Sequence, residues 1–256
     1  MCLLFKITQD RCAIGGLRED NDAWDLSVAR NMMTQSRLER TRIHNRLPVA
    51  REGIPFIIVG CFVTLILFLL GLRILPVVTA LFTLFTVYFF RDPGRDPEIE
   101  ERAVLSPADG KIVDIRKFED DHNPLGEPCL RVGIFMSIFN VHVNRVPVSG
   151  KIIKISYHPG KFFSANLDKA SAENENKKII LETDDGKRLM TVQIAGLIAR
   201  RIVCWIKEND QVIAGNRFGL IRFGSRLDVY FPQDSQITVQ YHQKVRAGET
   251  KLGYLP

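Results

Sequence analysis

The sequence predicts an α+β protein in which a two-helix hydrophobic membrane anchor precedes a β-rich, mostly antiparallel domain. Two long uncharged runs lie close together between residues 54 and 90. From about Val104 onward the pattern changes to short β-rich runs separated by Gly, Pro, Asn and Asp. We therefore expect a polar N-terminal extension over 1–45, the anchor over 46–97 and the β-rich domain over 98–256.

The N-terminal extension carries no motif that points to chemistry. A helix is expected over Ala23–Arg42, with Asp22 as its N-cap. No apolar core of a secretory signal forms near the start, because charged residues follow the first few positions. We expect this segment to be dispensable, with Met32 or Met33 as alternative starts.

The anchor rests on two apolar runs separated only by Arg73. Ile54–Leu72 has 19 uncharged residues and Ile74–Phe90 has 17. A helix needs about 20 apolar residues to cross the hydrocarbon core of a bilayer. The alternative is a buried helical hairpin in the core of a soluble domain, but two adjacent runs of this length favour membrane insertion.

Arginines flank the two runs and indicate the orientation of the anchor. They lie at Arg37, Arg40, Arg42, Arg46 and Arg51 before the first run and at Arg91 and Arg95 after the second. Because positive charge stays on the cytoplasmic side, both ends of the anchor are expected there, joined by a very short outer turn. A shallow re-entrant hairpin in one leaflet is the alternative.

The sequence beyond the anchor predicts a series of short strands. Pro93, Gly94 and Pro97 end the second helix and mark the domain boundary. Strands are predicted at Lys111–Ile115, Leu130–Phe139, Lys151–Tyr157, Lys178–Glu182, Leu189–Ile194, Ile202–Ile206, Gly219–Phe223, Leu227–Phe231 and Ile237–Tyr241. A short helix is expected over Phe162–Glu173.

Composition narrows the classes of site. The five cysteines are scattered and form no CxxC pair, which argues against a disulfide framework and against a zinc site. The net charge of +6 suits nucleic acid, anionic lipid or acidic metabolites, and by itself selects none of them.

Three polar segments stand out against the β-rich background. They supply Asp109, His142 and Ser225 and read SPADGK at 106–111, FNVHVNRVP at 139–147 and RFGSRLD at 222–228. A serine becomes a nucleophile when a base takes its proton, and that base needs an orienting group. Each residue also has a plain structural explanation, namely a turn aspartate, a core histidine and a hairpin serine.

The same segments, in this order, resemble the phosphatidylserine decarboxylase family and its short bacterial branch. The resemblance runs from about Ile43 to Pro232. Its longest stretches are YFFRDPGRDP, LSPADGKI, FMSIFNVHVNRVPVSGKI, YHPGKFFSANLDKASAENE and GLIARRIVCWIKENDQVIAGNRFGLIRFGSRLDVYFP. Several long motifs in one order make the match specific.

The resemblance implies a proenzyme that cleaves itself between Gly224 and Ser225. Residues 1–224 would become a β chain, and residues 225–256 an α chain headed by a pyruvoyl cofactor formed from Ser225. The two chains would remain a non-covalent pair. The cofactor would form a Schiff base with phosphatidylserine and release CO2 and phosphatidylethanolamine. No metal, nucleotide or nucleic-acid partner is implied.

The resemblance also implies roles for the polar residues and a location. His142 matches the base that takes the Ser225 proton, and Asp109 matches the acid that orients this histidine. Arg145, Arg200 and Arg201 are candidate contacts for the substrate's carboxylate and phosphodiester, although the last two also suit a solvated turn. The expected location is the bacterial inner membrane, with the catalytic domain on the cytoplasmic face.

Two departures from the longer-chain branch of the family leave one role open. That branch has Leu-Gly-Ser-Thr at the cleavage site, whereas this chain has Phe-Gly-Ser-Arg at 223–226. That branch also has a second histidine where this chain has Phe139. The donor that returns a proton to the product is therefore His142, Tyr157, His158 or an ordered water, and we favour His142.

A membrane-anchored biotinyl or lipoyl carrier is the main alternative. SPADGKIVDI and KENDQVIAGNRFGLIR resemble the hairpin turns of such domains, and the triplet at 168–170 is Asp-Lys-Ala. A lipoylated lysine needs an exposed hairpin, however, and this triplet lies in the polar segment Phe163–Asn176. The carrier interpretation also leaves His142 and the Phe-Gly-Ser-Arg segment unexplained. A further alternative, a membrane protein with a purely structural role, leaves the same residues unexplained.

Overall fold

The computed structural model describes residues 48–119, 125–161, 173–196, 201–222 and 224–256. These residues all belong to one compact unit. Several predictions lie outside the described residues: the helix over Ala23–Arg42, nearly all of the helix over Phe162–Glu173, the Asp-Lys-Ala triplet at 168–170, Arg200 and Phe223.

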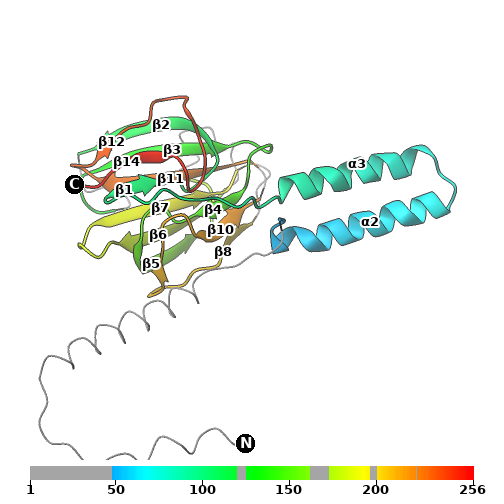
Figure 1. Ribbon diagram of the computed structural model, residues 1–256, viewed down its shortest axis with the longest axis horizontal. Helices are drawn as coiled ribbons and strands as arrows, with labels where there is room; N and C mark the ends of the chain where they lie inside the picture. The colour runs from blue at the N-terminus through cyan, green and yellow to red at the C-terminus, as the bar shows by residue number, and fades with distance from the viewer. Residues whose placement is uncertain (1–47, 120–124, 162–172, 197–200, 223) are drawn as a thin grey trace, which may run out of the picture. The chain divides into compact units, whose positions relative to one another are not determined.

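The two apolar runs form an antiparallel helical hairpin, as predicted (Figure 1). A 3-10 turn, η1 (Arg51–Gly53), leads into α2 (Ile54–Leu69), and α3 (Ile74–Phe89) follows. Helix α2 ends before the apolar run does, because Gly71 takes a φ of +74° in the connecting turn. The helices touch closely at Gly60, where an added Cβ would lie 2.4 Å from Thr83 Oγ1.

The rest of the described chain is β-structure in three sheets. Their strand orders are β13-β2-β3-β11-β7-β6-β5-β9, β1-β14-β12 and β4-β10-β8. The strands are β1 (Ala103–Leu105), β2 (Gly110–Phe118), β3 (Cys129–Met136), β4 (Val143–Arg145), β5 (Gly150–His158), β6 (Asn176–Glu182), β7 (Arg188–Ile194), β8 (Ile202–Cys204), β9 (Gln211–Val212), β10 (Arg217–Ile221), β11 (Ser225–Pro232), β12 (Gln236–Ile237), β13 (Lys244–Val245) and β14 (Lys251–Tyr254). All pairings between these strands are antiparallel, which confirms the predicted sheet type.

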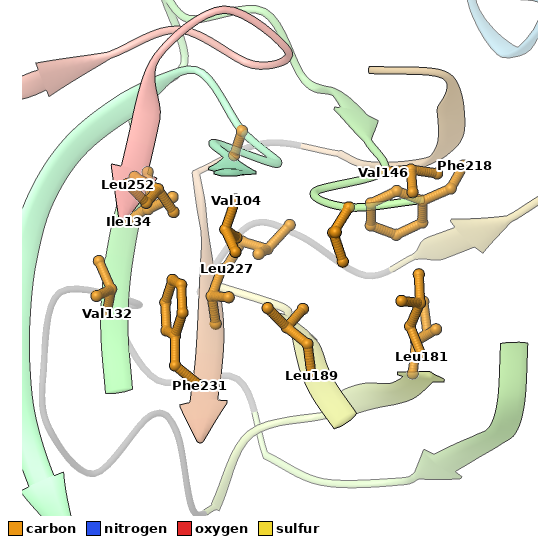
Figure 2. Close-up of a cluster of buried hydrophobic side chains, with 14 of the residues drawn as sticks. Val104, Val132, Ile134, Val146, Leu181, Leu189, Phe218, Leu227, Phe231 and Leu252 are labelled. Carbon is orange, nitrogen blue, oxygen red and sulfur yellow. The ribbon is translucent and has the colours of Figure 1, made fainter. Parts of the chain in front are cut away.

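Strand β11 occupies the middle of the largest sheet, between β3 and β7 (Figure 1). Its residues Leu227, Val229 and Phe231 are fully buried. Figure 2 shows Leu227 and Phe231 among apolar side chains from several other strands, including Ile134 and Leu189. Burying each such side chain contributes about 1.5–3 kcal/mol, so residues 225–256 begin with a strand that is strongly held by its neighbours.

The base of the helical hairpin packs against the β-structure. Backbone hydrogen bonds run from Ala50 N–H to Phe90 O at 2.7 Å and from Asp92 N–H to Pro48 O at 2.8 Å. A buried apolar cluster joins the hairpin to β4 and β10 and comprises Ala50, Phe89, Phe90, Val141, Val143 and Leu220. The anchor therefore meets the β-structure close to His142, which lies between two members of this cluster.

Candidate active site

Ser225 is the first residue of β11 and is completely buried. Its Oγ has no hydrogen-bond partner among the described residues. Gly224, just before it, has a φ of +49°, and an added Cβ would have open space around it. The conformation, rather than crowding, therefore favours glycine here, since other residues lose about 1–2 kcal/mol in this region. The pair combines an unengaged hydroxyl with an unshielded neighbouring carbonyl.

His142 lies just before β4 and is almost fully buried. Neither ring nitrogen has a hydrogen-bond partner among the described residues. The ring packs on Phe89 of α3, with centroids 4.1 Å apart. Burial lowers the pKa of His142 to about 4, and the charge of Arg91 acts in the same direction, whereas the Asn140 backbone opposes them. The imidazole is therefore neutral at pH 7, which is the form that accepts a proton.

The strand pairing brings the segments of His142 and Ser225 together. Ile221 N–H donates to the carbonyl oxygen of His142 at 3.4 Å, and Ser225 follows Ile221 by four positions. Asn144, two positions beyond His142, donates from Nδ2 to Met136 Sδ at 3.6 Å. Met136 is in turn the register partner of Ser225. Residues far apart in the sequence thus converge on the start of β11.

Asp109 lies in the turn between β1 and β2 and makes different contacts from those expected. Its Oδ1 accepts from Ala247 N–H at 2.7 Å, and its Oδ2 pairs with Arg95 Nη2 at 3.0 Å. Arg95 also pairs with Glu249 at 3.0 Å. The expected contact, in which the Asp109 carboxylate would accept a hydrogen bond from His142, is not formed among the described residues, and Arg95 and Ala247 N–H engage the carboxylate instead.

The predicted arginines differ in their surroundings. Arg145 is buried, and it donates to Gly215 O at 2.8 Å and to Pro93 O at 2.9 Å. Burial, reinforced by the charge of Arg217, lowers the pKa of Arg145 to about 10. Its donors serve internal contacts, so the structure favours a structural role over substrate binding. Arg201 is exposed and therefore accessible to an anion.

Tyr157 and His158, two of the possible proton donors, lie at the exposed end of β5. Strands β6 and β7 separate β5 from β11. With about 4.8 Å between neighbouring strands, this places β5 about 14 Å from β11. Of the three side chains considered for this role, His142 is the buried one.

A buried ionic cluster next to Ser225 was not predicted. Arg226 donates from Nε to Asp228 and from Nη2 to Asp114 at 3.1 Å, and Arg131 Nε donates to Asp114 at 2.6 Å. These side chains are almost fully buried. Gly133 gives them room, because an added Cβ there would lie 2.6 Å from Arg226 Nη2. The only sequence signal was charge at alternate positions of an apolar strand.

The residues present fit a cofactor formed from Ser225. The hydroxyl is buried and free of competing hydrogen bonds, the preceding residue is glycine, and a neutral histidine lies in a converging segment. In the described part of the chain, no group of three or more His, Cys, Asp or Glu side chains is placed to hold a metal ion. The arrangement suits attack of the serine on its own peptide bond.

Comparisons with known proteins agree with this chemistry. The family model described as "Phosphatidylserine decarboxylase" matches residues 82–253. The phosphatidylserine decarboxylase proenzyme of Syntrophus aciditrophicus is 55% identical over 206 residues, which cover 80% of this chain and 96% of that protein. The proenzymes of Desulfotalea psychrophila and Geotalea uraniireducens are 51% and 47% identical, over 82% of this chain and 98% and 97% of theirs.

These matches support the decarboxylase interpretation. They give no support to the carrier interpretation. They extend across the helical hairpin as well as the β-structure, because they cover about four-fifths of the chain. The chain belongs to the phosphatidylserine decarboxylase family and is a carboxy-lyase.

Proposed function

We propose that the chain cuts itself between Gly224 and Ser225 and, once matured, converts phosphatidylserine into phosphatidylethanolamine and CO2. The observation that carries the proposal is the buried, unpartnered Oγ of Ser225, which directly follows a glycine with positive φ. Unpaired polar atoms are expensive to bury, so their retention here points to reactivity. The proenzyme names of the relatives are consistent with such processing.

The first step forms an ester in place of a peptide bond. Ser225 Oγ attacks the Gly224 carbonyl carbon, the C–N bond breaks, and the amino group of residue 225 gains a proton. His142 takes the hydroxyl proton, because its imidazole is neutral at pH 7 and its ring nitrogens have no partner among the described residues. Gly224 has no Cβ, so no side chain of its own shields the attacked carbonyl, and its positive φ is a conformation that glycine readily adopts.

The second step releases the two chains. Loss of a proton from Cα of residue 225 breaks the Cβ–O bond, and Gly224 leaves as a carboxylate. Water then replaces the nitrogen at residue 225, and ammonia departs, which leaves a pyruvoyl group. When present, this group supplies a carbonyl that binds the substrate amine and withdraws electrons as CO2 leaves. His142 is our candidate for returning a proton to the product.

Asp109 supports this site as a positioning residue in our proposal. Its carboxylate holds Ala247 N–H and Arg95, which ties the turn before β2 to the segment that follows the anchor. Because no direct contact joins Asp109 to His142 among the described residues, the role that we propose for Asp109 is an indirect one.

After cleavage we propose that the α and β chains stay together without a covalent bond. Strand β11 begins at the cleavage site and pairs with β3 and β7 along its length. Its residues Leu227, Val229 and Phe231 belong to the main apolar core, and Figure 2 shows two of them, Leu227 and Phe231. Removing one peptide bond leaves all of these contacts in place.

We also propose that the helical hairpin inserts in the bacterial inner membrane, with the catalytic domain on the cytoplasmic face. The outward side chains of α2 and α3 are apolar and exposed. The helix Arg51–Leu69 is long and apolar enough to cross a membrane, and Ile74–Phe89 is apolar but shorter. Exposed apolar surface on this scale is typical of a membrane or protein contact.

Release of CO2 from carboxyl-labelled phosphatidylserine tests this function. Purified wild-type protein in detergent micelles should release label, and Ser225→Ala should release none and remain a single chain. Ser225→Cys, which keeps a nucleophile, serves as the matched control and should cut itself slowly. Equal release by the Ser225→Ala variant would contradict the proposal, as would a cleaved wild-type protein that releases no label.

A further inference from the structure

An apolar groove of about 790 Å³ runs along the helical hairpin between α2 and α3. Phe56, Val59 and Val63 line it from α2, and Val78 and Phe82 line it from α3. Among the described residues that line it, Arg222 alone is charged, and it belongs to the β-structure at the base of the hairpin. The groove is therefore apolar along its length and cationic at one end.

The dimensions of the groove suit a lipid chain. Its lining on α2 extends from Pro55 to Val63, which is about 12 Å of helix at 1.5 Å per residue. One leaflet of the hydrocarbon core is about 15 Å deep, half of the full thickness. An acyl chain in the groove would thus lie parallel to its neighbours in the bilayer, with its headgroup at the level of Arg222.

The surroundings of Arg222 favour the binding of an anion. Its Nε is buried and has no hydrogen-bond partner among the described residues, and its guanidinium lies 5.3 Å from the centre of the Phe56 ring. Burial lowers the pKa of Arg222, and the nearby charge of Arg201 acts in the same direction. A second cation beside a partly desolvated arginine favours a phosphodiester, which offers acceptor oxygens to both.

The nearby carboxylate of Glu52 leaves Arg222 available to bind an anion. The charge of Glu52 acts on Arg222 and favours its charged form. Glu52 Oε1, however, accepts a hydrogen bond from Trp205 Nε1 at 2.8 Å, and no ion pair joins Glu52 to Arg222 among the described residues. Arg222 also lies only three positions before Ser225, so a bound headgroup would lie near the residue that carries the chemistry.

We propose that the groove between α2 and α3 binds one acyl chain of phosphatidylserine while Arg222 binds its phosphodiester, so that the serine moiety reaches residue 225. This inference rests on the proposed function and adds a lipid-binding site to it. The anchor then does more than hold the enzyme at the membrane, because it takes the substrate directly from the bilayer.

The test compares a groove variant with a matched control. Val59→Trp fills the groove, whereas Ile58→Trp places the same side chain at a neighbouring, equally exposed position outside the lining. KM and kcat are measured per cleaved protein, in mixed micelles, with long-chain and with dihexanoyl phosphatidylserine. Val59→Trp should raise KM for the long-chain substrate roughly tenfold and leave the short-chain KM within about twofold. Ile58→Trp should change neither beyond twofold.

Three further variants keep the proposal falsifiable if Val59→Trp fails to mature. Val63→Trp blocks the far end of the groove, so its effect should appear only with acyl chains long enough to reach it. Arg222→Gln should raise KM for both substrates roughly tenfold with little change in kcat, and Arg222→Lys should restore part of the loss.

Several outcomes would overturn the lipid-binding site. These are equal effects of tryptophan at positions 58 and 59, an effect of Val59→Trp on both substrates alike, or an unchanged KM in Arg222→Gln. Cleaved wild-type protein that decarboxylates neither substrate would instead contradict the proposed function itself, which separates the two failures.

Discussion

Ser225 and His142 contrast with Asp109 and Arg145, although all four are buried polar residues. The reactive atoms of the first pair have no hydrogen-bond partner among the described residues. The charged groups of the second pair are engaged by backbone and side-chain partners. Burial alone therefore does not separate the two pairs, whereas their hydrogen-bond partners do, and we take the unpartnered groups beside Gly224 as the candidate reactive ones.

The largest effect is expected from His142→Gln, which removes the base and keeps a polar side chain. A general base contributes about 10²–10⁴ in rate, so self-cleavage should slow by that factor. The measurement is a time course of chain separation on denaturing gels during cell-free synthesis. Maturation of this variant at the normal rate would remove His142 from the role of base.

Arg226→Leu tests the other side of the contrast, because Arg226 belongs to a fully partnered cluster. Its loss leaves Asp228 and Asp114 with less positive charge in a buried site. Breaking a buried ion pair costs about 3–5 kcal/mol. We expect that decrease in the unfolding free energy of the uncleaved Ser225→Ala protein, measured by denaturant titration in detergent.

The double variant Arg226→Leu, Asp228→Leu is the control for this prediction. Replacing both partners by apolar side chains is often close to neutral, so the double variant should recover most of the lost stability. A double variant no more stable than Arg226→Leu would show that the lost stability does not come from leaving Asp228 without its partner.

Stability should also depend on pH through His142. Its pKa is about 4 in the folded chain and about 6.5 when unfolded, so the unfolded chain binds the proton more readily. This contribution to stability is complete above pH 6.5 and is lost as the pH falls toward 4. Between pH 7 and pH 5 the Ser225→Ala protein should lose about 2 kcal/mol through this group.

The His142→Gln change in the same background isolates that pH effect. The unfolding free energy of the Ser225→Ala, His142→Gln protein should decrease less between pH 7 and pH 5 in the same denaturant titration. An identical decrease in both proteins would assign the pH dependence to other groups.

Asp109→Asn and Arg95→Gln should give the smallest effect, and they should act alike. Each removes the same ion pair, while Glu249 still partners Arg95 in the first variant. Stability should decrease by about 1 kcal/mol, and cleavage should slow modestly in both variants. If Asp109→Asn alone blocked cleavage on the same gels, a direct contact with His142 would replace the positioning role.

Sequence patterns predicted the two hairpin helices and the longer strands, because the hydrophobic pattern or the length of each segment is enough to indicate its structure. Residues 54–90 carry an apolar signal that only Arg73 interrupts, and Leu227–Phe231 alternates in a central strand. The short strands β1, β4, β9, β13 and β14 were missed because two to four residues carry too little pattern. The predicted strand Ile237–Tyr241 was wrong beyond Ile237, where β12 ends.

The candidate site was predictable only in part. Gly224, Ser225 and His142 stand in ordered motifs, and the structure brings their segments together. The pairing of Arg226 with Asp114 depends on the register of β2, β3 and β11, which spans more than 100 residues of sequence. The internal contacts of Arg145 and the pairing of Asp109 with Arg95 depend on tertiary packing in the same way.

The most direct test of the central claim is the intact mass of the denatured, purified wild-type protein. We predict two chains, residues 1–224 with a free carboxylate and residues 225–256 with a pyruvoyl group in place of an N-terminal amine. The smaller chain should resist N-terminal sequencing until its carbonyl is converted to an amine. An active preparation that contains only the full-length chain, or a small chain that begins with an intact serine, would contradict the account.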